Sequence, residues 1–185
     1  MTQPSRDSYL YTPFYCEENI WHLAKQIVAD KSWVIFISNP DRRFPLWMQR
    51  ASKEEALPIL WDYHVVLLTQ DKDRFQIWDL DSRLELPVVA AKYMAQTILP
   101  NRLLKGRWRV YFRMVTASEF LSSFASDRSH MKSKEDGRWL EKPPHWKPIR
   151  TQDTIMNLES FINMEREFKG EILDEENFLR RFCQN

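Results

Sequence analysis

The sequence predicts an α+β fold in which a helix near the N-terminus packs on a mostly antiparallel sheet and further helices close the chain. Two observations support this prediction: an amphipathic segment precedes the first strand, and the clearest pair of strands is joined by a short turn. A third is that strands and helices do not alternate as a parallel sheet requires. The 185 residues make one domain, 1–185, with a loose leader over residues 1–13.

The elements are predicted in order from local patterns. The first helix runs from Cys16 to about Asp30, because apolar residues from Ile20 onward recur on one face. An apolar strand follows at 33–38. Residues 43–49 form an edge strand at best, because they contain Pro45, and 51–58 form a loop.

The clearest hairpin of the chain is predicted after this loop. Its strands are 61–69 and 74–81, and its turn is 70–73. Further predictions are a helix over 87–98, a strand over 108–115 and a short helix capped by Ser118. A long ordered loop over 125–153 and two closing helices, 157–164 and 174–183, complete the chain.

Composition excludes several classes of function. Apolar residues make up 43% and charged residues 29%, which is typical of a globular protein. The net charge of +1, without a Lys/Arg block, argues against a nucleic-acid partner. The sequence contains no apolar run long enough to span a membrane and no signal-peptide core, so we expect neither a membrane protein nor a secreted one. The two cysteines, Cys16 and Cys183, suggest a reducing cytoplasmic compartment, which in a eukaryote extends to the nucleus.

Three residues have the chemistry of a cysteine-dependent hydrolase. Cys16 stands at a helix start, where the helix dipole favours the thiolate. A symmetric turn centred between residues 71 and 72 places His64 directly opposite Asp79, close enough for a hydrogen bond that orients the imidazole. Each residue alone has an ordinary structural explanation: a buried cysteine, a packed histidine and a strand-end aspartate.

Several strings resemble the protein N-terminal glutamine amidohydrolase family. They are Tyr15-Cys16-Glu17-Glu18-Asn19, Trp61-Asp62-Tyr63-His64, Asp79-Leu80-Asp81 and residues 124–131. The resemblance implies a monomeric enzyme with a papain- or transglutaminase-like core and a triad of Cys16, His64 and Asp79. It also implies deamidation of an N-terminal glutamine of a protein or peptide, which in eukaryotes creates a degradation signal.

The expected chemistry passes through a thioester and needs no metal or other cofactor. A free N-terminus requires an acceptor for its α-ammonium group, because a buried unpaired cation is costly. Asp127 is the first candidate, Asp62 the second, and Trp61 is a candidate for lining the pocket. Asp127 could instead only brace its own loop.

Two kinds of alternative remain open at this point. A cysteine protease or a transglutaminase-like acyl transferase could use the same three residues. A non-enzymatic module could use a similar cleft to hold peptide N-termini.

Overall fold

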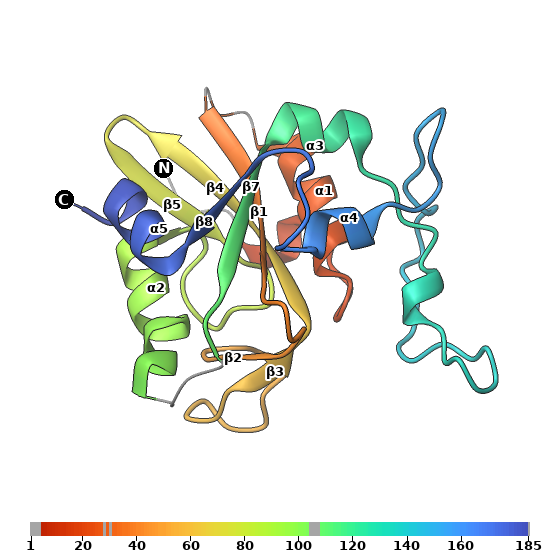
Figure 1. The fold of residues 1–185 in the computed structure, drawn as a ribbon, viewed down its shortest axis with the longest axis horizontal. Coiled ribbons are helices and arrows are strands. Elements are labelled where there is room, and N and C mark those ends of the chain that lie inside the picture. The colour runs from red at the N-terminus through yellow and green to blue at the C-terminus, as the bar shows by residue number, and fades with distance from the viewer. Residues whose placement is uncertain (1–4, 28, 30, 104–107, 185) are drawn as a thin grey trace.

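The computed structural model describes residues 5–27, 29, 31–103 and 108–184. Over these residues, its centre is a six-stranded sheet with strand order β6-β5-β4-β1-β7-β8 and antiparallel pairing between neighbours (Figure 1). The strands are β1 (Lys31–Ser38), β4 (Tyr63–Asp71), β5 (Arg74–Trp78), β6 (Val88–Val89), β7 (Tyr111–Thr116) and β8 (Glu171–Asp174). A separate two-stranded sheet pairs β2 (Phe44–Leu46) with β3 (Ile59–Trp61). The predicted α+β class with an antiparallel sheet is confirmed.

Helices cover both faces of the large sheet. One side carries α1 (Cys16–Gln26), α3 (Ala117–Ser123) and α4 (Leu158–Ile162), and the other carries α2 (Ala90–Thr97) and α5 (Glu175–Phe182) (Figure 1). Short 3₁₀ turns are η1 (Arg6–Ser8), η2 (Leu99–Leu103) and η3 (Ser129–Met131). Because successive strand residues point to opposite faces, the sheet separates two apolar cores, and the middle residues of β1 and β4 are apolar on both faces.

Some element boundaries differ from the sequence prediction. Helix α1 ends at Gln26, and the predicted end at Asp30 lies outside the described residues. Helix α2 begins at Ala90 because the β-branched Val88 and Val89 pair with β5 instead of entering the helix. Strand β8 was not predicted, because four residues before a helix cap carry little periodic signal.

The β4–β5 hairpin has a register two residues away from the predicted one. Asp71 pairs with Arg74 and Leu67 with Trp78, so the turn is formed by Lys72 and Asp73. Lys72 has a φ of 53°, the left-handed conformation that a two-residue turn uses. A shift of two residues leaves every side chain on its predicted face, since the side-chain period of a strand is two.

Residues expected to form a loose leader are bound to the domain from Arg6 onward. The Arg6 guanidinium donates to the backbone oxygens of Asp79 (2.9 Å), Leu80 (3.3 Å) and Leu84. Thr12 is held by the side chain of Asn19, which bonds both its N–H (2.9 Å) and its oxygen (2.8 Å). This N-terminal segment therefore clamps the turn that follows β5.

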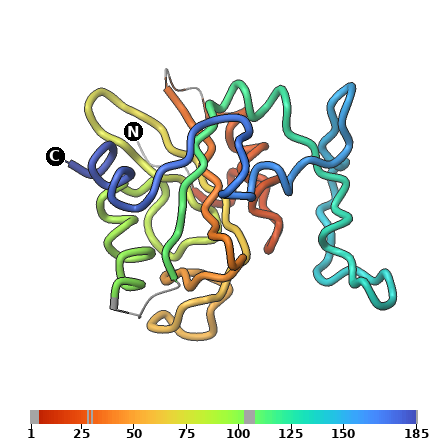
Figure 2. Tube along the Cα trace, viewed as in Figure 1, coloured from red at the N-terminus to blue at the C-terminus, as the bar shows by residue number. Residues whose placement is uncertain are grey.

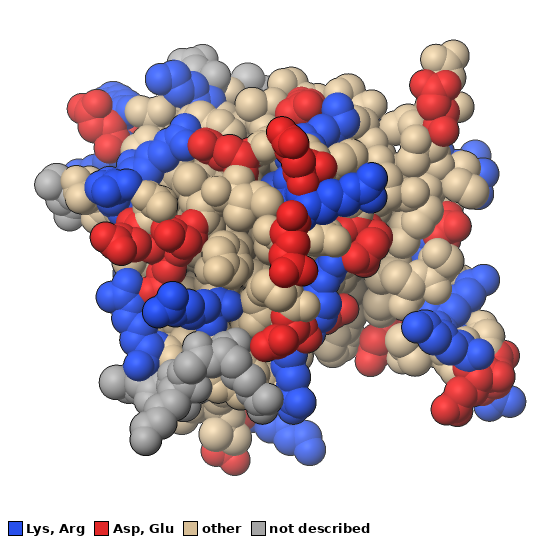
Figure 3. Space-filling view, in the orientation of Figure 1, with Lys and Arg blue, Asp and Glu red and all other residues tan. Residues whose placement is uncertain are grey.

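The chain between α3 and α4 extends well beyond the sheet, on the side of α1 (Figure 2). It contains η3 and agrees with the predicted long ordered loop. The face in Figure 3 mixes acidic and basic side chains without a large area of one sign. None of the helices described is long and apolar enough to cross a membrane.

Candidate active site

Cys16 is the first residue of α1 and is 2% exposed. Its side chain belongs to the apolar core between α1 and β4, together with Tyr63 and Val65. The backbone of Val65, the residue directly after His64, is close enough to the thiol to lower its pKa. The start of α1 and the start of β4 thus bring the thiol to the backbone that carries the imidazole.

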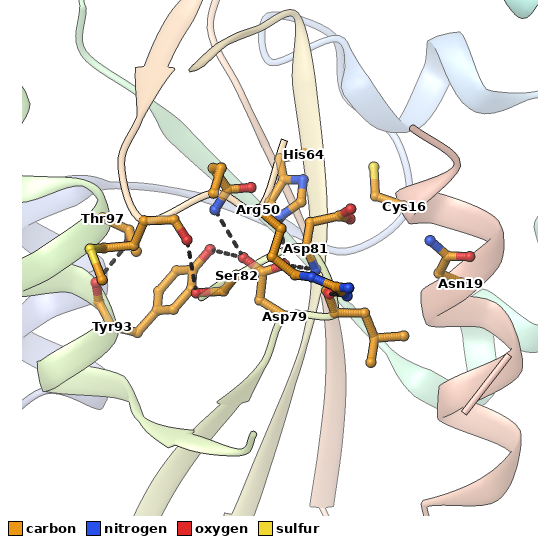
Figure 4. A network of polar contacts seen from close by, with 12 residues as sticks. Cys16, Asn19, Arg50, His64, Asp79, Asp81, Ser82, Tyr93 and Thr97 are labelled. Atoms are coloured by element: carbon orange, nitrogen blue, oxygen red, sulfur yellow. Dashed lines mark hydrogen bonds and ion pairs between the residues drawn. The ribbon is translucent and has the colours of Figure 1, made fainter. Parts of the chain in front are cut away.

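His64 and Asp79 are in contact, as predicted, although the register differs. His64 Nε2 lies 3.0 Å from Asp79 Oδ1, and both side chains are fully buried. In the observed register Asp79 is a diagonal neighbour of His64 on the same face, within reach of an imidazole. Nε2 makes an ion-pair contact with Asp79 that lacks hydrogen-bond geometry, and Nδ1 is buried with no partner among the described residues. In Figure 4 this free side of the ring and the sulfur of Cys16 face the same space.

The carboxylate of Asp79 is held by several donors besides His64. Tyr93 on α2 donates its hydroxyl to Oδ2 (2.9 Å), and Gln49 Nε2 lies 3.4 Å from the same oxygen. The backbone N–H of Asp81 donates to Oδ1 (2.9 Å). These contacts fix the carboxylate, and the carboxylate in turn fixes the imidazole.

The His64–Asp79 pair favours its charged form despite complete burial. Burial opposes a charge on His64, but the charge and hydrogen bond of Asp79 outweigh it and raise the pKa of His64. Burial likewise opposes ionisation of Asp79, but His64, Tyr93 and the Asp81 N–H together lower the pKa of Asp79. The pair therefore remains ionised more readily than two isolated buried groups would.

The expectation that the helix start makes Cys16 a ready thiolate is wrong. Burial raises the pKa of Cys16 well above its ordinary value, and the negative charges of Glu17 and Asp81 raise it further. Only the Val65 backbone acts in the opposite direction among the main causes. A base is therefore needed to remove the thiol proton near neutral pH.

Glu17 forms a second polar group beside the thiol, which the sequence reasoning missed. It is fully buried, and its Oε2 lies 3.8 Å from Cys16 Sγ and accepts the Tyr63 hydroxyl at 3.0 Å. His130 Nε2 lies 3.4 Å from Oε1 of Glu17 and 3.2 Å from the Tyr63 hydroxyl. Two acidic residues after a helix start ordinarily suggest only favourable dipole contacts, so local sequence gave no signal of this burial.

Glu18 anchors the long segment between α3 and α4. Arg128 binds its carboxylate with two nitrogens, Nε at 2.7 Å and NH2 at 2.8 Å. Trp146 Nε1 donates to the same carboxylate at 2.7 Å, and Arg128 also donates to the oxygens of Pro144 and Trp146. The partners of Glu18 thus come from a segment more than a hundred residues away in the chain.

The three predicted substrate-binding residues have different surroundings. Asp127 is partly exposed and accepts the backbone N–H of Ser129 at 2.9 Å, as a loop-bracing residue would. Asp62 is exposed and accepts the Tyr63 N–H at 2.9 Å. Trp61 is buried and packs against the His64 ring at 5.2 Å between centroids. It lies in the core opposite α1, whereas Tyr63 lies in the core beside α1, because the chain breaks between β3 and β4. Their roles in binding stay predictions.

His64, Asp79 and Asp81 each offer an atom for a metal within 4.8 Å of one another. In the structure two of these three groups already bind each other, through His64 Nε2 and Asp79 Oδ1. A metal at this position would have to compete with that contact for the imidazole or for the carboxylate.

The sequence profile of the N-terminal glutamine amidase family matches residues 11–182, nearly the whole chain. The chain belongs to the N-terminal glutamine amidase family.

Relatives in this family come from plants and animals. The protein N-terminal glutamine amidohydrolase of Arabidopsis thaliana is 41% identical over 168 residues, covering 84% of this chain and 76% of the relative. The Homo sapiens protein of the same name is 37% identical, with 97% and 90% covered, and that of Drosophila melanogaster is 32% identical, with 95% and 89% covered. Family membership therefore extends over the segments that hold Cys16, His64 and Asp79.

Proposed function

We propose that this chain is a protein N-terminal glutamine amidohydrolase that converts an N-terminal glutamine to glutamate through a thioester on Cys16. The observation that carries the proposal is the state of His64. Its Nε2 lies 3.0 Å from the Asp79 carboxylate, while its buried Nδ1 has no polar contact among the described residues and faces the space that Cys16 shares. The names of the relatives support the substrate. The helix that bears the cysteine and the antiparallel sheet that bears the histidine support a papain- or transglutaminase-like core.

The first half of the reaction forms the thioester. With the imidazole proton on Nε2, the nitrogen beside Asp79, Nδ1 has a lone pair that accepts the Cys16 proton. The sulfur attacks the carboxamide carbon of the substrate side chain, and His64 returns the proton to the departing nitrogen, which leaves as ammonia. Asp79 stabilises the imidazolium that forms between these two proton transfers. This agrees with the raised pKa of His64, to which Asp79 contributes.

The second half consumes the thioester. His64 takes a proton from water, the hydroxide attacks the thioester carbon, and the proton returns to the sulfur. The start of α1 is suited to bind the oxyanion in both halves, because first-turn N–H groups lack helical partners and the Tyr15 side chain makes no capping bond. The sum is addition of one water and loss of one ammonia, without a cofactor.

The test of this function is a product assay. A peptide that begins with glutamine should gain about 1 Da and release ammonia in equal amount, since OH replaces NH₂. The same peptide beginning with asparagine, or with glutamine moved inside, should not react. Cleavage of the peptide bond would indicate a protease, and transfer to an added amine would indicate a transglutaminase. Binding without any product would indicate a module that only holds peptide N-termini.

Asp79→Asn should reduce the rate of deamidation by about 10²- to 10⁴-fold, because an amide cannot stabilise the imidazolium and can hold the wrong tautomer. Tyr93→Phe is the matched comparison, since it removes one donor to the same carboxylate and should cost about tenfold at most. Ammonia release under saturating peptide measures both. Equal rates for the two variants would rule out an orienting role for Asp79.

The cellular setting follows from the same proposal. The enzyme acts as a monomer on proteins and peptides in the cytoplasm, without nucleic acid as a partner. In a eukaryote its product, an N-terminal glutamate, would enter a degradation pathway that recognises N-termini.

A further inference from the structure

Asp81 is an acidic residue of the site that the proposed chemistry does not use. It comes two residues after Asp79, in the turn that follows β5, and its N–H bond to Asp79 fixes its backbone. Continuation of the β4–β5 register would place it opposite His64. The residue is 4% exposed, and Figure 4 shows its carboxylate in the space between His64 and Cys16.

The Asp81 carboxylate has an oxygen to spare. Its Oδ1 accepts the Tyr11 hydroxyl at 2.7 Å. Among the described residues, no group donates a hydrogen bond to Oδ2 of Asp81. Arg50 is nearby but stacks on the Tyr11 ring and donates to the Leu80 oxygen. Burial raises the pKa of Asp81 to about 6, and Asp79 adds to this rise, so the carboxylate lacks a sufficient cation.

We propose that Asp81 binds the α-ammonium group of the substrate and so restricts the reaction to free N-termini. This inference rests on the proposed function. An N-terminal ammonium that enters a buried site needs a carboxylate, because an unpaired buried cation is costly. Asp81 supplies that acceptor beside the imidazole, within the 4.8 Å cluster that it forms with His64 and Asp79.

Binding of the ammonium at Asp81 would also make the reaction depend on the length of the substrate side chain. In glutamine, about 5 Å separate the α-nitrogen from the carboxamide carbon when the chain is extended. An ammonium fixed on Asp81 therefore presents the carboxamide at a set distance toward Cys16. Asparagine is shorter by one carbon, or about 1.3 Å, so its carboxamide would stop short of the sulfur.

Asp81 is better placed than the two acceptors predicted from sequence. Asp127 accepts a backbone bond within its own loop, and Asp62 is exposed and accepts the N–H of the next residue. Asp81 alone of the three appears among the charges that act on both Cys16 and His64. Because the charge of Asp81 raises the pKa of Cys16, an ammonium that offsets this charge also makes the thiol easier to ionise.

The experiment compares two substrates on the same enzyme. One is a short peptide that begins with glutamine, and the other is its 2-hydroxy analogue, in which OH replaces the α-amine. The ratio of their kcat/KM values reports recognition of the ammonium. In Asp81→Asn, which keeps an acceptor for Tyr11, this ratio should fall by about 10- to 100-fold relative to wild type. A general disturbance of the site would lower both values and leave the ratio unchanged.

Comparison variants make the outcome decisive. Asp153→Asn removes an exposed aspartate and should leave the ratio at the wild-type value. An unchanged ratio in Asp81→Asn, or a collapse in Asp127→Asn or Asp62→Asn instead, overturns the proposal. Asp81→Ser is the second variant if the asparagine does not fold. Failure of the wild-type enzyme to release ammonia from the glutamine peptide would instead refute the proposed function.

Discussion

Cys16→Ala should lower ammonia release from a glutamine-initiated peptide by at least about 10⁴-fold, because no other group near His64 can form the thioester. The fold should be retained, since alanine fits the space of the buried side chain with the loss of one sulfur atom. Continuous measurement of ammonia gives the rate, and circular dichroism with a melting curve verifies the fold. A folded Cys16→Ala enzyme with more than a tenth of the wild-type rate would contradict the mechanism.

The second cysteine provides the control. Cys183 is the C-cap of α5, is half-buried, and belongs to the other core, the one on the side of α2 and α5. Burial raises its pKa to about 11, and the proposed chemistry gives it no role. Cys183→Ala should therefore keep the wild-type rate. Acid quenching during turnover should trap the acyl group on wild-type enzyme and on Cys183→Ala, but not on Cys16→Ala.

Arg128→Met should lower the free energy of unfolding by about 3–5 kcal/mol, because it leaves the Glu18 carboxylate buried without its cation. Glu18 is fully buried and Arg128 is 6% exposed at its side chain, so solvent cannot replace the lost partner. Urea denaturation followed by tryptophan fluorescence measures the change. Activity should fall as well, since Glu18 is two residues from Cys16 and holds the segment between α3 and α4.

Two further variants isolate the pair. Arg138→Met removes a cation from the same segment, but its contact with Asp136 is exposed, with 86% of the Arg138 side chain accessible. Its unfolding curve should match that of wild type within error. The double variant Glu18→Gln with Arg128→Met should be less destabilised than the sum of the two singles, because each single leaves one buried charge unpaired and the double leaves none. Additive losses would show that the two residues do not stabilise each other.

The sequence predicted the contact between His64 and Asp79 better than it predicted the hairpin. His64 and Asp79 meet even though the turn lies one residue later than expected, because a two-residue shift returns each side chain to the same face. The same shift explains why the sequence did not predict the place of Asp81 beside His64. In the predicted register it stood opposite Asp62, a pair of like charges, whereas the observed register places it opposite His64.

Other features of the site depend on contacts that local patterns do not encode. Glu17 and Glu18 read as ordinary first-turn acidic residues, but their partners lie 46 or more residues away in the chain. The pKa of Cys16 likewise follows from burial against β4 and not from its place in α1. Periodicity identifies helices and strands, but it does not indicate which loop will close over a helix start.

The clamp formed by Arg6 has a practical implication for protein engineering. The family profile begins at residue 11, so a version trimmed to the matched region would omit Arg6 while retaining Cys16, His64 and Asp79. In such a protein the turn after β5 would lack the hydrogen bonds that Arg6 donates to it. Low activity could then be mistaken for an unsuitable peptide substrate. Expression designs should therefore begin upstream of Arg6 and place any purification tag at the other terminus.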